Sequence, residues 1–199
     1  MRRSIYLSVL ASVCLAVVVA CTSAPQGGKT ISPNAALDNI FARKSVREYL
    51  DRGVEKDKID WMLRAGMAAP SARDLRPWEF VVVDERAKLD SMAAELPYAK
   101  MLTQVRYAIV VCGDSARSSL WYLDCSAATQ NILLAAESLG LGAVWTAAYP
   151  YDDRMQTVRK YTVLPDSIVP LCVIPFGYPA TSQQPKQKYD EKKIHYNKY

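Results

Sequence analysis

The segment RKSVREY, residues 43–49, carries charged and hydroxyl side chains at alternate positions. Successive side chains of an extended backbone point to opposite faces, so Arg43, Ser45 and Arg47 would lie on one face. Two guanidiniums and a hydroxyl on one face form a cradle that suits a phosphate group. A solvent-exposed charged face has the same spacing, so this segment alone leaves both interpretations open.

Residues 69–83, APSARDLRPWEFVVV, form a second segment that suits ligand binding. Pro70 ends the preceding helical pattern, and Ser71 is small enough to let a flat ligand approach the main chain. Arg73 and Arg76 face either an anion or solvent. A third segment, GLGAVWTAAY, combines two glycines with small residues, which lets main-chain N–H groups reach a ligand. It does not match the dinucleotide-binding fingerprint, which needs a strand before its glycines and a helix after them.

The composition of the chain restricts the kinds of site that it can hold. With 50% hydrophobic and 23% charged residues, it is expected to form one globular domain with a substantial core. A net charge of +5 without a basic stripe argues against nucleic acid as the main partner and allows small anionic ligands. The only histidine is His195 and no CxxC pair is present, so neither a zinc site nor a Cys–His nucleophile is expected. Buried free thiols are expected at Cys112, Cys125 and Cys172.

The elements that must position these segments alternate between helices and strands. The helical pattern of residues 120–139 is the longest and is apolar around most of its circumference, which is typical of a central helix. Residues 54–69 predict an amphipathic helix whose apolar stripe consists of Ile59, Met62, Leu63 and Met67. We expect helices over residues 33–43, capped by Asn34 or Ser32, and over 54–69, 87–96, 120–139 and 152–161. We expect strands over 79–84, 107–114, 140–150 and 168–179, the last interrupted by prolines, and an extended segment over 45–50.

The first 33 residues have the order of an export signal. Two arginines precede an apolar run over residues 5–20, which is shorter than the roughly 20 residues that a spanning helix needs. The run ends in VVAC and is followed by a polar spacer. This order predicts a lipoprotein signal peptide over residues 1–20, a lipidated Cys21 and a flexible tether over 21–33. The product would be an exported, membrane-anchored lipoprotein on the periplasmic side. In the alternatives, the N-terminal segment is retained as a membrane anchor or is removed as an ordinary signal peptide.

The last 20 residues are polar and rich in lysine, with large side chains among the charges. A disordered end is one interpretation. Because Ile194, Tyr196 and Tyr199 lower solubility when they are free, the second interpretation is that the tail packs on another surface, such as a second subunit.

Taken in order, five segments resemble the nitroreductase family of flavoproteins over residues 34–199. They are RKSVREY, APSARDLRPWEFVVV, AATQNILLAAESLGLGAVWTAAYP, FGYP and the basic tail. The resemblance implies an α+β three-layer fold in which helices flank a central, mostly antiparallel sheet. It also implies a domain-swapped tail and a homodimer with one FMN at each of two subunit interfaces.

The resemblance implies cofactor-binding roles in several segments. A phosphate-binding segment matches Arg43, Lys44, Ser45 and Arg47. A loop that the partner subunit lays against the flavin matches Pro70, Ser71, Ala72, Asp74 and Arg76. A strand whose main chain faces flavin N5 matches Thr146, Ala147 and Ala148. Lys100 matches a residue near the ribityl chain or the pyrimidine edge, and Lys186 or Lys188 matches a tail cation that closes on the phosphate.

This chain departs from the family pattern in the partner loop. The family usually has P-S-x-x-N-x-Q-P-W, whereas this chain has Asp74 for the Asn and Arg76 for the Gln. A carboxylate near a reduced flavin disfavours the anionic hydroquinone, unless Arg73 or Arg76 neutralises it. The tail also offers lysine where arginine is common, which keeps the charge and loses bidentate geometry.

The resemblance implies an FMN-dependent oxidoreductase that transfers two electrons by a ping-pong mechanism. The donor would be NAD(P)H or another reductant, and the acceptor a nitroaromatic, a quinone or a similar planar compound. No side chain need act as an acid or base, because the cofactor performs the hydride transfer. NAD(P)H is scarce outside the cytoplasm, so a membrane quinol or a partner protein is an alternative donor. Two other functions stay open: a flavin-binding lipoprotein without turnover, and a flavin-fragmenting or dehalogenating enzyme.

Overall fold

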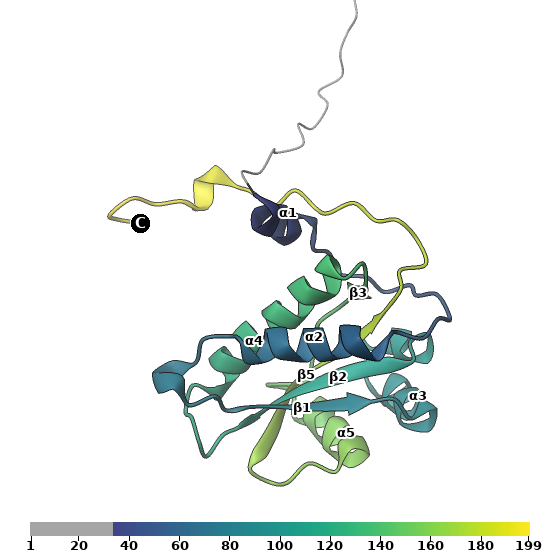
Figure 1. The fold of residues 1–199 in the computed structure, drawn as a ribbon. Coiled ribbons are helices and arrows are strands. Elements are labelled where there is room, and N and C mark those ends of the chain that lie inside the picture. The colour runs from purple at the N-terminus through teal and green to yellow at the C-terminus, as the bar shows by residue number, and fades with distance from the viewer. Residues whose placement is uncertain (1–33) are drawn as a thin grey trace, which may run out of the picture. The chain divides into compact units, whose positions relative to one another are not determined.

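The computed structural model describes residues 34–199, and their centre is an antiparallel β-sheet (Figure 1). The strands follow the order β1-β2-β5-β3, and β4 also pairs with β5. Their bounds are β1 (Trp78–Val83), β2 (Tyr107–Asp114), β3 (Gly142–Ala143), β4 (Thr146–Ala147) and β5 (Ile168–Gly177). β2 and β5 are therefore the central strands, and β1 lies at one edge.

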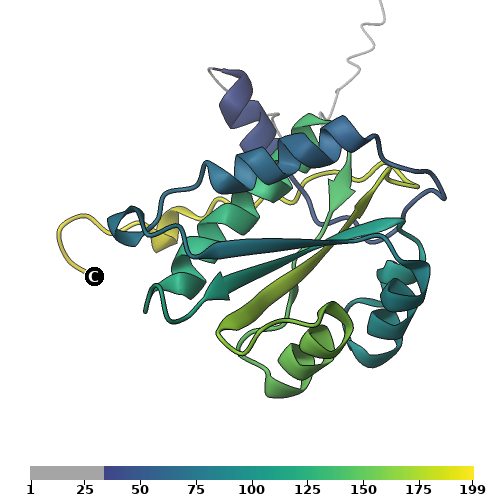
Figure 2. The same cartoon turned by 60° about the horizontal axis from the view of Figure 1, so that its bottom comes forward.

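Helices cover both faces of the sheet, which confirms the expected three-layer α+β fold (Figure 2). The helices are α1 (Ala35–Ala42), α2 (Lys56–Met67), α3 (Arg86–Glu95), α4 (Trp121–Ser138) and α5 (Asp152–Thr162). Side chains of β2 alternate between the layers: Ile109 and Val111 pack with α2 and α4, whereas Ala108 and Val110 pack with α3 and α5. Because both faces are covered, the strand is a continuous apolar run in the sequence.

Helix α2 is the expected amphipathic helix except at its last turn. Ile59 and Met62 are buried, but Met67 is 55% exposed, so the predicted stripe is wrong at that position. Gly66 occupies the buried place instead, and a Cβ there would lie 3.0 Å from Ile132 of α4. The close approach of α2 to α4 leaves no room for a side chain at this crossing, which helical periodicity alone does not reveal.

The segment after α4 differs from the single strand expected over residues 140–150. It forms two short strands, β3 and β4, which both pair with β5. Strand β5 is continuous, so the expected interruption by prolines is also wrong. A register shift between Val111 and Cys112 leaves Leu171 as an extra residue next to Pro170. Such a bulge accommodates a proline, which has no N–H to donate to the ladder.

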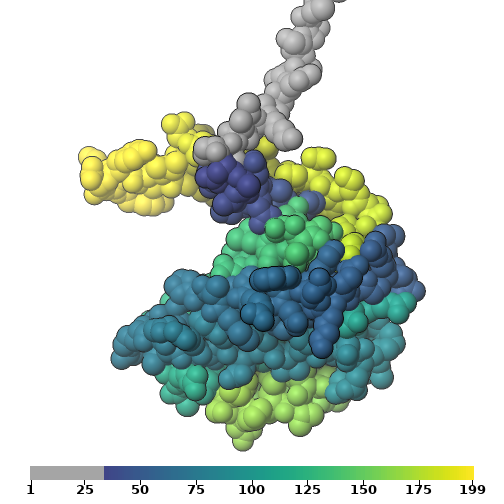
Figure 3. Space-filling view, in the orientation of Figure 1, coloured from purple at the N-terminus to yellow at the C-terminus, as the bar shows by residue number. Residues whose placement is uncertain are grey.

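Helix α1 and the C-terminal tail project from the three-layer body (Figure 3). Asn34 caps α1 by accepting a hydrogen bond from the main chain of Leu37 (3.1 Å), and α1 contains no buried residue. Among the side chains left exposed in this single chain are Ile40 and Phe41 of α1 and Ile194, Tyr196 and Tyr199 of the tail. These three tail residues are therefore not buried against their own chain, and their packing on a second subunit stays a prediction.

The three cysteines of the described chain, Cys112, Cys125 and Cys172, are buried and free, as the sequence predicts. Within residues 34–199, no cluster of three or more His, Cys, Asp and Glu side chains is suited to hold a metal ion. No helix in this same range has the length and hydropathy needed to cross a membrane. The signal peptide, Cys21 and the tether lie outside the described residues.

Candidate functional site

A pocket of about 460 Å³ brings together residues from three of the predicted segments. Arg47 comes from the segment after α1, Lys100 from the short 3-10 helix Lys100–Thr103, and Thr146 and Ala147 from β4. These residues are far apart in the sequence, and the pairing of β4 with the middle of β5 contributes to bringing them together. Other lining residues, which the sequence analysis does not single out, include Tyr98, Trp145 and Arg154.

The segment that carries Arg47 is fixed against β3. Ser45 forms a parallel bridge with Ala143, and the N–H of Val46 donates to the carbonyl of Ala143 (3.1 Å). Val46 is buried where Gly142 has no side chain. Because side chains alternate along an extended segment, burying Val46 turns Arg47 outward, and Arg47 is exposed and lines the pocket.

Tyr49 holds the end of this segment from inside the protein. Its hydroxyl donates to the carbonyl oxygen of Val46 (2.6 Å), and its own N–H donates to the Gln104 side chain (3.1 Å). Burial raises the pKa of the Tyr49 phenol, so the hydroxyl keeps its proton and stays a donor. The course of the chain through residues 45–49 is thus set by buried contacts rather than by the charged side chains.

Three residues of the predicted phosphate-binding segment, Arg43, Lys44 and Ser45, lie outside the lining of this pocket. Arg43 ends α1, with its N–H donating to the carbonyl of Asn39 (3.1 Å). The ammonium of Lys44 pairs with Glu137 of α4 (2.8 Å) and also donates to the carbonyl of Ala42 (3.4 Å). In this chain Lys44 therefore ties the segment to α4, and its role toward a phosphate stays a prediction.

Strand β4 presents small residues whose position is fixed by β5. The hydroxyl of Thr146 donates to the carbonyl of Val173 (2.6 Å), and the N–H of Ala148 donates to the carbonyl of Leu171 (2.9 Å). Thr146 and Ala148 are buried, whereas Ala147 between them is half-buried and lines the pocket. A flat ligand can approach the main chain here because no large side chain intervenes.

Lys100 stabilises the end of α3 in addition to lining the pocket. Its ammonium donates to the carbonyls of Ala93 (2.8 Å) and Ala94 (3.0 Å), in the last turn of that helix. A cation is favourable there, because the helix dipole places partial negative charge at the C-terminus. The ammonium has a third N–H, which leaves it one donor for a ligand.

The loop over residues 70–76 has a backbone that few side chains tolerate. The φ angles of Arg73, Asp74 and Arg76 are +54°, +55° and +48°, in the left-handed region. Ser71 Oγ accepts from the N–H of Arg76 (3.0 Å), and the N–H of Ala72 donates to Asp124 Oδ1 (2.9 Å) at the start of α4. Unusual backbone of this kind persists only when surrounding contacts hold it, and it is frequent in binding loops.

The Asp74 carboxylate in this loop is compensated within the loop itself. Arg76 donates to it twice, from Nε (2.7 Å) and from Nη2 (2.5 Å), and both side chains are exposed. These hydrogen bonds hold the pKa of Asp74 below its ordinary value. Of the two arginines that the sequence offered as neutralising partners, Arg76 therefore takes this role in the structure.

The loop and the pocket lie apart in the fold, because the loop borders the edge strand β1, whereas β4 at the pocket pairs with β5, beyond β2. The loop directly precedes Trp78, whereas Val83 at the other end leads to α3 and then to Lys100. Neighbouring strands lie about 4.8 Å apart, so β4, three strands away from β1, is roughly 14 Å across the sheet from it. One chain therefore presents the two predicted parts of the cofactor site as separate surfaces. Lys186 and Lys188 of the tail are exposed and do not line the pocket.

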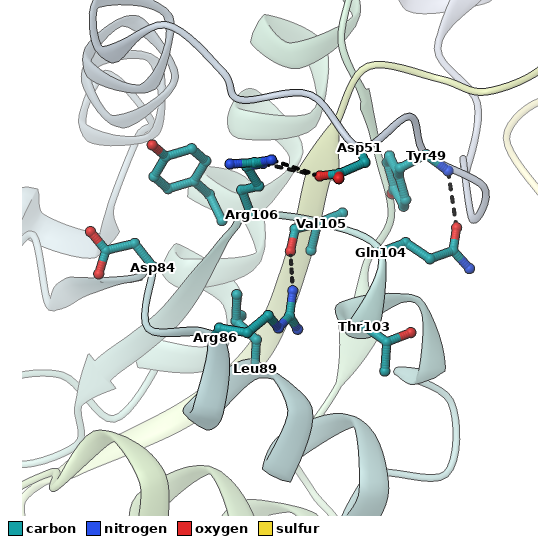
Figure 4. A pocket seen from close by; sticks show the side chains of 10 residues that line it. Tyr49, Asp51, Asp84, Arg86, Leu89, Thr103, Gln104, Val105 and Arg106 are labelled. Atoms are coloured by element: carbon teal, nitrogen blue, oxygen red, sulfur yellow. Dashed lines mark hydrogen bonds and ion pairs between the residues drawn. The ribbon is translucent and has the colours of Figure 1, made fainter.

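Another concave region, of about 770 Å³, lies where the ends of β1 and β2 meet α3 (Figure 4). It contains none of the predicted site residues. Two of its arginines already have partners: Arg106 pairs with Asp51 (2.9 Å), and Arg86 donates to the carbonyl of Val105 (2.7 Å). Although this groove is larger, the smaller pocket is the better candidate because its side chains converge without an acidic residue among them.

The residues of the smaller pocket fit a planar anionic group such as FMN. Arg47, Lys100 and Arg154 supply three positive charges, and no Asp or Glu is among the lining residues. The Nε of Arg154 is buried and has no hydrogen-bond partner within the described residues. Arg154 was not predicted from the sequence, since only the packing of α5 beside β4 brings this helical arginine to the pocket. Its nearness in sequence to the third segment was the one available signal.

Comparison with known proteins places the chain in a family. The model of the nitroreductase family matches residues 40–112 and 90–178. A crystal structure from Bacteroides thetaiotaomicron, described as a candidate NADH dehydrogenase/NAD(P)H nitroreductase, is 81% identical and has a TM-score of 0.84, covering 84% of this chain and 100% of its own. A relative from Methanothermobacter thermautotrophicus with the same description is 44% identical over 172 residues, or 85% of this chain and 90% of its own. The structure of an FMN-dependent nitroreductase from Clostridium difficile is 31% identical, with a TM-score of 0.78 over 82% of this chain and 99% of its own. Since the match extends over most of residues 40–178 in both sequence and fold, this chain belongs to the nitroreductase family.

Proposed function

We propose that the chain is an FMN-dependent oxidoreductase that passes two electrons by a ping-pong mechanism. The donor is NAD(P)H or another reductant, and the acceptor is a nitroaromatic, a quinone or a similar planar compound. The pocket lined by Arg47, Lys100, Ala147 and Arg154 carries the proposal, because three cations beside a strand of small residues suit a flat, anionic ligand. The names of the relatives, an FMN-dependent nitroreductase and two candidate NAD(P)H nitroreductases, support it.

The residues of this chain bind and orient the cofactor, and FMN, when bound, supplies the hydride chemistry. Arg47 and Lys100 contribute positive charge that favours an anionic ligand. The bond from Thr146 to Val173 keeps β4 rigid, so the main chain of Ala147 is held in place before a ligand arrives. No side chain of the pocket need exchange a proton with the substrate, and we therefore assign no catalytic acid or base.

We propose a homodimer in which each pocket is completed by the partner's loop over residues 70–76. The separation of the loop from the pocket supports this arrangement, because within one chain β2 and β5 lie between β1, which the loop precedes, and β4 of the pocket. The exposed apolar side chains of α1 and the tail offer surface for such an interface: Ile40, Phe41, Ile194, Tyr196 and Tyr199. Lys186 or Lys188 would then reach the phosphate of an FMN at the interface.

The alternative of a flavin-binding lipoprotein without turnover rests on the carboxylate of Asp74 and on the scarcity of NAD(P)H outside the cytoplasm. The structure pairs Asp74 with Arg76, so this carboxylate gives no specific reason to prefer that alternative.

The location of the protein is a separate proposal. We propose an exported lipoprotein anchored through Cys21, on the order of the basic start, apolar run and VVAC motif. Mass spectrometry of the membrane fraction would detect an acylated Cys21 at the mature N-terminus, and a soluble chain that retains Met1 would contradict it.

The visible spectrum of the full-length protein tests the proposed function. Purified protein, reconstituted with FMN and passed through a desalting column, should retain a yellow flavin spectrum. Anaerobic addition of NADH or NADPH should bleach it, and addition of a quinone or nitroaromatic should restore it. A protein that retains no flavin contradicts the proposal at its first step. A yellow protein that neither NADH, NADPH nor a quinol bleaches supports flavin binding without turnover.

A further inference from the structure

Arg154 of α5 is held in a fixed position at the pocket by three groups. Its guanidinium carbon lies 3.7 Å from the centre of the Tyr151 ring and 5.1 Å from that of Tyr98. Its Nη1 donates to the carbonyl of Ala147 in β4 (3.5 Å). Stacking on aromatic faces and a bond to the main chain remove much of the rotational freedom of this long side chain. Arg154 is thus oriented before any ligand binds.

The contacts of Arg154 leave donors without a partner beside the pocket. Nε is buried and makes no hydrogen bond to any group in residues 34–199. A buried donor without an acceptor destabilises a protein, so native structures almost always satisfy such a group. Because Tyr151 covers one face of the guanidinium, its remaining N–H groups can serve only acceptors that lie near its plane.

The electrostatic surroundings of Arg154 favour a negatively charged ligand. Arg47 and Lys100 line the same pocket, and none of its lining residues is acidic. The main-chain group that Arg154 contacts, the carbonyl of Ala147, belongs to the half-buried residue of β4 that lines the pocket. A ligand at this position must therefore bring both negative charge and in-plane acceptors.

We infer that Arg154 is a cofactor-binding residue whose guanidinium edge contacts the ring of FMN and stabilises its reduced, anionic form. The inference rests on the proposed function, since it needs FMN in this pocket. The flavin ring carries carbonyl oxygens and nitrogens in its plane, and these match the donors that stacking leaves available. A cation at the ring attracts the reduced anion more strongly than the neutral oxidised ring.

Flavin binding to Arg154→Gln protein tests the inference, with FMN and riboflavin as probes. Fluorescence quenching should show at least a tenfold loss of affinity for both flavins, since the contact is with the ring that they share. The reduced flavin should lose about ten times more affinity than the oxidised one, which lowers the two-electron potential by about 30 mV. Arg154→Lys keeps the charge and loses the planar fork, so its affinity should fall while its potential changes little.

Arg64→Gln is the matched control, since it removes one exposed arginine from α2, away from the pocket. Affinity and potential should equal those of the wild type. If Arg154→Gln loses affinity for FMN but not for riboflavin, Arg154 contacts the phosphate and the inference is overturned. Unchanged flavin affinity and potential with a raised KM for an anionic acceptor would also overturn it. If wild-type protein binds no FMN, the proposed function fails instead. If Arg154→Gln does not fold, Arg154→Lys decides, and unchanged flavin affinity in that variant overturns the inference.

Discussion

The approach of residues 45–47 to β3 depends on the missing side chain of Gly142, so Gly142→Ala should disturb the pocket. A Cβ at this position would lie 2.7 Å from Cβ and Cγ1 of Val46 and 2.8 Å from its Cγ2. Carbon atoms in contact are normally about 3.5–4.0 Å apart, so one of the two residues must move by about 1 Å. Val46 is only 1% exposed, so its side chain cannot move out into solvent without a shift of the surrounding core.

The size of the effect follows from the cost of overpacking a core. Extra methyl groups in a packed interior usually cost about 1–3 kcal/mol, and we expect Gly142→Ala to destabilise the protein by that amount. For a chain of this size, each kcal/mol lowers the melting temperature by about 2–4 °C. Because Val46 lies between Ser45 and Arg47, its displacement should also weaken FMN binding. Urea unfolding of the flavin-free protein and fluorescence titration with FMN measure the two effects.

A second substitution separates steric overlap from a general effect of alanine. Val46→Gly removes all three contacting atoms. The double variant should therefore lose less free energy of unfolding than the two single variants lose together, by about 1 kcal/mol or more. Gly53→Ala is the control: its Cβ would meet nothing closer than Arg106 Cδ at 4.0 Å, and it should be neutral or slightly stabilising. Strict additivity of Gly142→Ala and Val46→Gly, or a neutral Gly142→Ala, would refute the steric argument.

Three further predictions concern charge, the tail and the buried thiols. Asp74→Asn should raise the two-electron potential of bound FMN and Arg76→Gln should lower it, since each leaves the other charge uncompensated; spectroelectrochemical shifts of the same sign would contradict this. Truncation after Pro179 should weaken both dimerisation and FMN retention, and a truncated protein that stays dimeric and yellow would disprove the role of the tail. Burial raises the pKa of the three free cysteines to about 12, so iodoacetamide at pH 8 should label them only after unfolding in urea. Because the folded state then holds protons that the unfolded state releases, these thiols stabilise the fold fully below about pH 8.5 and less as the pH rises above it.

The elements that pack on both sides were predictable from the sequence, because burial leaves a local pattern. The strand expected over residues 107–114 is β2, and the helix expected over 120–139 is α4, shorter by one residue at each end. The strand expected over residues 140–150 failed because β3 and β4 are defined by their pairing with β5, more than 20 residues later. A window of local hydropathy contains no information on that pairing.

The candidate site was predictable only where its residues belong to a recognisable segment. Arg47, Lys100, Thr146 and Ala147 were identified in advance, and the fold brings all four to one pocket. Arg154 was not, because its position depends on how α5 packs beside β4. The partners of Lys44 and Lys100 were also beyond the sequence, since a lysine that pairs with a glutamate or ends a helix looks the same as one that binds a ligand.

The two unusual residues of the partner loop are best understood as a single change. Asp74 adds a negative charge where the family has a neutral Asn, and Arg76 adds a positive charge where it has a neutral Gln, so the paired side chains leave the net charge of the loop unchanged. Backbone geometry favours the same pair, because Asp tolerates the left-handed region nearly as well as Asn does. Arg76 tolerates it less well, and its N–H bond to Ser71 Oγ with its two bonds to Asp74 supplies the compensation. Neither substitution would be as acceptable alone: Asp74 without Arg76 would leave an unpaired carboxylate in the loop, and Arg76 without Asp74 would keep an unusual backbone with fewer contacts to hold it.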